Sequence, residues 1–191
     1  MIYLITGKKR AGKDTTADFL KSYIGGRKIA LADPMKMVAQ VMFDWDYNHI
    51  EHYKETVDPR YGISPRQFLQ TFGTEYAQFY LSDKFPEYKT TTGRTLWAKY
   101  LVNTIKKYPE VNNWFVSDVR FPHEVEEVTK AFDDVKVLKI IRPDHICKDE
   151  HCSETSIDEI ISDVVMFNTG TLTDYDNMIH DYVRRNYSWM A

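Results

Sequence analysis

Short apolar runs alternate with longer amphipathic segments along most of the 191-residue chain. Apolar runs bounded by turn residues predict buried strands, whereas apolar positions spaced by three and four residues predict helices. The sequence predicts strands at residues 1–6, 28–32, 114–118, 135–141 and 163–167. It predicts helices at residues 13–23, 34–43, 64–81, 94–108, 122–132 and 173–187. Strands that alternate with helices in this way are typical of an α/β layer fold with a parallel sheet.

Polar segments interrupt this alternation at residues 44–63 and 142–157. The first is expected to be loop-like, and residues 82–93 are expected to form a loop. No Gly-, Ser- or Pro-rich linker divides the chain, so a single domain is expected over residues 1–191. Within it, residues 44–93 are expected to form a substrate-binding flap, and the second polar segment a small lid.

One helix start is marked especially clearly. Ser64 is a capping residue, Pro65 suits the first helical position, and Gln67 follows the Ser by three residues. This pattern predicts a capping box at the start of the helix expected from residue 64.

The segment from Gly7 to Lys13 has the spacing G-x-x-x-x-G-K and lies between a predicted strand and a predicted helix. In this context the glycines let backbone N–H groups face an anion, and the helix N-terminus adds positive potential. Lys13 is expected to reach the β- and γ-phosphates of a nucleotide. Further candidates for phosphate contact are Arg10 and Gly12 in the loop and the hydroxyl groups of Thr15 and Thr16.

Asp14 stands where a P-loop usually carries the Ser or Thr that reaches Mg²⁺. Its carboxylate is either a Mg²⁺ ligand, directly or through water, or an acid that stabilises the start of a helix. These two interpretations stay open from the residues alone.

Composition narrows the function classes. The formal net charge of −3 gives no global basic field, so no nucleic-acid partner is expected. The N-terminal apolar run is too short for a signal peptide or a membrane span, and the two cysteines do not suggest a disulfide scaffold. A cytoplasmic protein without a membrane partner is therefore expected. The segment Asn168-Thr169-Gly170-Thr171 after the last strand also lacks the N-K-x-D motif that reads guanine, which disfavours a GTPase.

Several blocks of sequence, in order along nearly the whole chain, resemble the deoxynucleoside monophosphate kinases of bacteriophages. The blocks are "GKKRAGKDTTADFL", "LADPMK", "SPRQFLQTFGTE", "FVSDVRFPHEVEEV" and the tail "KIIRP…HCSE…NTGTL". The resemblance implies a three-layer P-loop kinase fold with a five-stranded parallel sheet and a small lid. It implies transfer of the γ-phosphoryl group of ATP to a deoxynucleoside 5′-monophosphate (dNMP) with Mg²⁺, giving dNDP and ADP for phage DNA synthesis in the host cytoplasm. It leaves open a homodimer, and an Asp after the P-loop Lys is usual in this family.

The resemblance also suggests roles for particular residues. Lys13, Asp118 and Arg120 are expected to act in phosphoryl transfer, with Asp14 and Asp118 as candidate Mg²⁺ ligands. Asp118 ends an apolar strand whose carboxyl edge is expected to face the P-loop. Arg142 and Asn168 are expected to bind ATP. Residues expected to bind the acceptor nucleotide are Lys36, Arg66, Gln70, Gly73, Thr74, Trp97, Asp118, Arg120, Glu124 and His151. For each of them a structural role is the alternative: an ion pair, a solvated helix face or an aromatic core position.

The predicted lid contains His145, Cys147, His151 and Cys152. Their spacing differs from the usual paired ligands of zinc sites, so incidental lid residues are favoured over a metal centre.

Two functional alternatives to the dNMP kinase remain: another small P-loop kinase, acting on dephospho-coenzyme A or phosphomevalonate, or a nucleotide-binding module without kinase activity.

Overall fold

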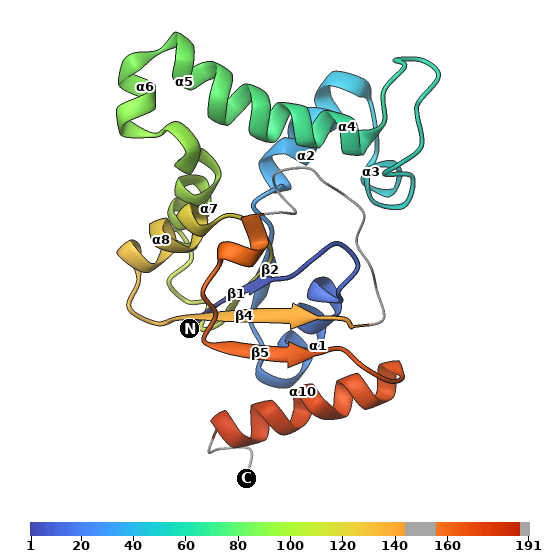
Figure 1. The fold of residues 1–191 in the computed structure, drawn as a ribbon, viewed down its shortest axis with the longest axis vertical. Helices are drawn as coiled ribbons and strands as arrows, with labels where there is room; N and C mark the ends of the chain where they lie inside the picture. Colours follow the sequence, from blue (N-terminus) through green and yellow to red (C-terminus); the bar gives the residue numbers. More distant parts are fainter. Residues whose placement is uncertain (144–155, 188–191) are drawn as a thin grey trace. The chain divides into compact units, whose positions relative to one another are not determined.

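The computed structural model describes residues 1–143 and 156–187 (Figure 1). The chain divides into two compact units, one formed by Met1–Ala30 with Leu101–Ala191 and the other by Leu31–Tyr100. The flap expected at residues 44–93 falls within the second unit. Most of the expected lid lies outside the described residues. The assignment of these segments as flap and lid stays a prediction.

The first unit contains a five-stranded sheet in which all paired strands are parallel, in the order β2-β3-β1-β4-β5. The strands are β1 (Ile2–Thr6), β2 (Arg27–Ile29), β3 (Trp114–Val119), β4 (Val135–Ile141) and β5 (Val164–Phe167). The sheet confirms the α/β class predicted from the alternation of apolar runs and amphipathic segments.

Helices of the first unit cover both faces of this sheet. They are α1 (Lys13–Ile24), α8 (Pro122–Ala131), the short 3₁₀ helix η3 (Ser156–Glu159) and α10 (Leu172–Asn186). The chain moves in one direction across the sheet from β1 through α1 to β2, and in the other from β3 through α8 to β4. Because parallel crossovers are right-handed, α1 and α8 lie on opposite faces. Helix α10 packs against α1, which gives the three layers expected of this fold.

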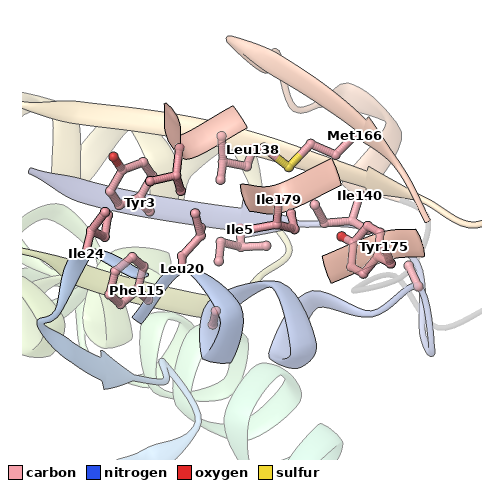
Figure 2. Close-up of a cluster of buried hydrophobic side chains, with 13 residues drawn as sticks. Tyr3, Ile5, Leu20, Ile24, Phe115, Leu138, Ile140, Met166, Tyr175 and Ile179 are labelled. Carbon is pink, nitrogen blue, oxygen red and sulfur yellow. The ribbon is translucent and has the colours of Figure 1, made fainter. Parts of the chain in front are cut away.

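The core between the sheet and the pair α1–α10 is shown in Figure 2. Tyr3 and Ile5 of β1 face this layer, with Leu20 from α1 and Ile179 from α10. All five residues of β1 are buried, as expected for a central parallel strand covered on both faces. The end of β1, where the glycine-rich loop begins, therefore rests on a packed core.

The second unit is helical. Its elements are α2 (Asp33–Phe43), α3 (Tyr47–His52), α4 (Pro65–Gln70), the π-helix η1 (Thr71–Tyr80), α5 (Leu81–Lys84), α6 (Pro86–Thr91), the 3₁₀ helix η2 (Gly93–Thr95) and the start of α7 (Leu96–Lys106). The predicted capping box is confirmed: the Ser64 hydroxyl accepts from the Gln67 N–H at 3.3 Å, and the Ser64 N–H donates to Gln67 Oε1 at 2.9 Å.

Two expectations for this unit are wrong. Residues 82–93, expected to be a loop, are mostly helical, and α3 lies inside the segment 44–63. Pro86 is tolerated in the first turn of α6, and Asp46 caps α3 by accepting from the His49 N–H at 2.6 Å. In both cases a helix of six residues lacks the long apolar periodicity by which helices are recognised in a sequence.

The segment after α3 is anchored by the carboxylate of Asp58. Its Oδ2 accepts from Trp45 Nε1 at 2.7 Å and from Arg60 Nη2 at 2.8 Å. The hydrogen-bonded guanidinium of Arg60 holds the pKa of Asp58 well below its usual range, although partial burial opposes this shift. The loop that contains Asp58 is thus hydrogen-bonded to the buried Trp45.

Among residues 1–143 and 156–187, no helix is both long and apolar enough to cross a membrane.

Candidate active site

The glycine-rich loop after β1 lines a pocket of about 370 Å³ in the first unit. Its wall combines the loop, the first turn of α1, the residue after β4 and the turn between β5 and α10. The lining residues are Arg10, Gly12, Lys13, Asp14, Thr15, Arg142, Asn168, Gly170, Thr171 and Leu172. The structure therefore brings together seven residues that the sequence analysis expected to bind ATP: Arg10, Gly12, Lys13, Asp14, Thr15, Arg142 and Asn168.

Both glycines of the motif stand where a side chain has no room. Gly7 has φ of 148°, and a Cβ there would lie 2.4 Å from the Ile140 carbonyl oxygen. Gly12 has φ of 105°, and its Cβ would lie 2.4 Å from Asn168 Nδ2. The Asn168 amide donates to the Ala11 carbonyl at 2.8 Å, so Asn168 packs directly against the loop. These contacts hold the loop in its curled form.

Lys13 points back into the loop. Its Nζ donates to the carbonyl oxygens of Gly7 at 2.7 Å and Lys8 at 2.9 Å, and the residue is buried. Lys8 instead forms an ion pair with Asp158 at 2.7 Å. Arg10 has φ of 62°, a left-handed conformation that is uncommon for a residue with a side chain.

Asp14 is held from two sides. Its Oδ1 accepts from the Ser117 hydroxyl of β3 at 2.7 Å and lies 3.5 Å from Lys28 Nζ of β2. Thr15 lines the pocket, whereas the buried Thr16 donates from Oγ1 to the Gly12 carbonyl at 2.9 Å and lies 2.6 Å from the Tyr175 hydroxyl. Thr16 thus braces the loop against α10 and is not among the pocket-lining residues.

The turn after β3 carries the next group of expected residues. Asp118 lies in β3 and Arg120 follows it, and neither is among the described residues that line the pocket. Glu124, in the first turn of α8, is buried and its Oε2 accepts from the N–H groups of Arg120 at 2.8 Å and Phe121 at 3.0 Å. Burial raises the pKa of Glu124 to about 7, although these two backbone hydrogen bonds oppose the shift. Glu124 therefore shapes the turn that carries Asp118 and Arg120.

In the second unit the two expected phosphate-binding cations have acidic partners. Lys36 Nζ lies 2.8 Å from Glu51 Oε1 and 3.5 Å from Asp33 Oδ1. Arg66 Nε donates to Glu55 Oε1 at 2.6 Å. Both side chains are largely buried.

The other expected acceptor residues of this unit lie along the helix that begins at Pro65. Gln70 is half-buried, whereas Gly73 and Thr74 are buried in the π-helical stretch. Trp97 is also buried, and its Nε1 donates to the Gly73 carbonyl at 2.7 Å. A Cβ on Gly73 would lie 2.2 Å from Met35 Sδ, so this glycine allows α2 to approach closely. Trp97 and Gly73 are therefore hydrogen-bonded to one another inside this unit.

His151 and the other Cys and His residues of the predicted lid lie outside the described residues. In the described part of the chain, no group of three or more His, Cys, Asp or Glu side chains is arranged to hold a metal ion. The residues present still suit Mg²⁺, because this ion commonly takes one or two carboxylates and completes its shell with water and phosphate oxygens. Asp14 at the pocket wall is a donor of this kind.

Sequence reasoning missed Ser117 and Lys28. The hydroxyl that binds Asp14 comes from the residue directly before Asp118, on the strand next to β1. A usable signal was present: an Asp at the Ser or Thr position of the loop, together with a Ser at the end of another apolar strand.

A parallel sheet with a strand, a glycine loop, a buried lysine and a helix in this order defines the class of P-loop nucleotide-binding proteins. Solved structures share this fold. The chain is similar to dephospho-CoA kinase from Campylobacter jejuni, with a TM-score of 0.53, 15% identity, and coverage of 100% of this chain and 98% of that one. It is also similar to TT1252 from Thermus thermophilus, with a TM-score of 0.50, 18% identity and 97% of each chain covered. At such identities the likeness concerns the fold alone.

The sequence model of the deoxynucleotide monophosphate kinase family matches residues 1–58 and 39–179. The chain belongs to this family. A protein of Acanthamoeba polyphaga mimivirus, provisionally named as a deoxynucleotide monophosphate kinase, is 29% identical over 180 residues and covers 92% of each chain. The protein is thus a phosphotransferase that uses ATP and deoxynucleoside monophosphates as substrates, as the ordered sequence blocks predicted.

Proposed function

We propose that the pocket beside the glycine-rich loop binds the triphosphate of ATP and directs its γ-phosphoryl group to the 5′-phosphate of a dNMP. The observation that supports this proposal most is the position of Lys13, a buried cation at the N-terminus of α1 in the pocket wall. Phosphoryl transfer needs positioning and charge neutralisation more than covalent chemistry, because an oxygen of the acceptor phosphate is the nucleophile. Arg10 and Arg142 add positive charge to the same wall.

In this proposal Asp14 is the carboxylate that holds Mg²⁺, and the ion neutralises charge on the phosphate oxygens when it is bound. Asn168 shapes the loop through its hydrogen bond to the Ala11 carbonyl. The turn at Gly170, Thr171 and Leu172 borders the same pocket and offers a site for the adenosine end of ATP. In this proposal the phosphates meet the N–H groups near Lys13, and the base lies toward that turn.

We assign recognition of the acceptor to the second unit. Lys36 and Arg66 are cations suited to the 5′-phosphate, and Gln70 and Thr74 can hydrogen-bond a base or sugar. Binding a phosphate there requires Lys36 and Arg66 to exchange or share their present partners, Glu51 and Glu55. Asp118 and Arg120 are proposed to act on the transferring group, Glu124 to support their turn, and His151 to contact phosphate. A homodimer stays part of the proposal, and sedimentation of the purified protein tests it.

A coupled assay of ADP release tests the proposed reaction and its competitors together. The purified enzyme is assayed with ATP, Mg²⁺ and, in turn, each dNMP, each ribonucleotide monophosphate, dephospho-coenzyme A and phosphomevalonate. We expect turnover with at least one dNMP and none with the last two acceptors. Turnover with dephospho-coenzyme A or phosphomevalonate in place of every dNMP would contradict the assignment of the acceptor.

A further inference from the structure

The P-loop position after Lys13 and the end of strand β3 carry an unusual pair of side chains. In P-loop NTPases of the common kind, the loop supplies a Ser or Thr hydroxyl to Mg²⁺ and a neighbouring strand supplies an Asp. Here the loop carries the carboxylate of Asp14, and β3 carries the hydroxyl of Ser117 directly before Asp118. The two groups are hydrogen-bonded, with Ser117 Oγ donating to Asp14 Oδ1 at 2.7 Å.

The place of Ser117 in the sheet fits this pairing. Strand β3 is the direct neighbour of β1, which leads into the loop. Their pairing shifts by one residue between Leu4–Val116 and Thr6–Val119, so β3 has one residue more than β1 over this stretch. Ser117 lies within that bulge, and bulges commonly re-aim side chains beside active sites.

Ser117 is also nearly inaccessible, with 3% of its surface exposed, and its described hydrogen bond is to Asp14. Lys28 approaches the same Oδ1 atom at 3.5 Å, and it also pairs with Asp18 at 2.8 Å. Both contacts are made to Oδ1 of an exposed side chain that lines the pocket. We expect them to favour one orientation of the Asp14 carboxylate.

We propose that Ser117 is a positioning residue for the metal-binding carboxylate of Asp14. The inference rests on the proposed role of Asp14 toward Mg²⁺. It assigns a role to a residue outside the pocket wall, and it explains why an Asp in the loop is compatible with a working site.

Binding of a non-hydrolysable ATP analogue, measured by calorimetry with Mg²⁺ and with EDTA, tests the proposal without turnover. Partners that orient metal ligands typically affect metal affinity about 10- to 100-fold. We expect Ser117→Ala to reduce the Mg²⁺-dependent gain in affinity for the analogue about tenfold. In EDTA this variant should bind the analogue as tightly as the wild type does. Ser117→Thr, which keeps the hydroxyl, is expected to restore the gain. Ser22→Ala, an exposed serine on α1, is the matched control.

The comparison of Ser117→Ala with Ser117→Thr decides the positioning role. Equal Mg²⁺-dependent gains in affinity in these two variants would overturn it.

The same measurements separate this inference from the proposed role of Mg²⁺. A wild-type protein that gains no affinity from Mg²⁺ contradicts the metal role of Asp14, and with it the inference. A wild-type gain that Ser117→Ala retains contradicts only the positioning role of Ser117.

Discussion

The P-loop pocket and the second unit hold their cations in different ways. In the pocket, Lys13 donates to two neutral backbone carbonyls of its own loop. In the second unit, Lys36 and Arg66 each lie against a carboxylate, Glu51 and Glu55. The loop carbonyls hold Lys13 in the wall of the pocket, whereas the carboxylates neutralise part of the charge of Lys36 and Arg66. The comparison therefore predicts that the loop lysine contributes more to catalysis than either paired cation.

The largest expected effect belongs to Lys13→Ala. Loss of a positioned charge at the transferring phosphoryl group commonly costs about 10²- to 10³-fold in rate, and we expect kcat/KM for ATP to fall about 10³-fold. The measurement is the coupled assay at saturating dNMP, with thermal unfolding to verify that the variant is folded. Lys21→Ala, an exposed lysine on the same helix, is the control. A decrease of less than tenfold in kcat/KM for Lys13→Ala would contradict the larger role predicted for the loop lysine.

The acidic residues of the two units can be compared in the same way. Glu124 is buried and accepts hydrogen bonds from backbone N–H groups, whereas Glu51 and Glu55 lie against cations. The Glu124 pKa of about 7 in the folded protein exceeds the ordinary value of 4.5. Between these two pH values the folded state binds more protons than the unfolded state, so the free energy of unfolding falls as pH rises. The expected decrease is about 3 kcal/mol, and it levels off above pH 7.

Glu124→Gln removes this titration while keeping an acceptor for the backbone N–H groups. Urea unfolding of both proteins from pH 4 to 8 measures the difference. The stability of the wild type relative to Glu124→Gln should fall across the pH range named above. A difference independent of pH would show that Glu124 titrates normally.

A smaller effect is expected from the paired cations. Charge-assisted hydrogen bonds contribute about 1.5–3 kcal/mol, so Lys36→Ala and Arg66→Ala should each raise the KM for dNMP about tenfold or more. The KM for ATP should stay within twofold. Lys89→Ala, an exposed lysine of the same unit, controls for loss of surface charge. An unchanged KM for dNMP in both variants would assign these residues to structural ion pairs.

The smallest effect is expected for Trp97→Phe. The change leaves the Gly73 carbonyl without its indole donor, and we expect a loss of about 1 kcal/mol in unfolding free energy. The KM for dNMP should change less than threefold, because the indole N–H is already engaged. A large rise in this KM with unchanged stability would instead support base recognition by Trp97.

The two units also differ in how well the sequence predicted them. The order of strands and helices in the first unit follows from apolar runs and from the spacing G-x-x-x-x-G-K, since both act over a few neighbouring residues. The second unit was predicted less well: the helices α3, α5 and α6 have short apolar patterns, and α4 continues into a π-helix that no local pattern indicates. Trp97 and Gly73 illustrate the same limit, since a hydrogen bond across 24 residues has no signature in either segment.

By itself the sequence determined the class of the fold, the phosphate loop with Lys13, and the family to which the ordered blocks point. These features depend on local geometry: a short apolar strand, glycines that permit positive φ, and a helix that starts at the lysine. Only the tertiary structure decided what surrounds Asp14. Ser117 lies 103 residues away in the chain and reaches the loop because β3 pairs with β1 and carries an extra residue there. Contacts of this kind arise from sheet register and packing, which depend on the whole fold and not on neighbouring residues.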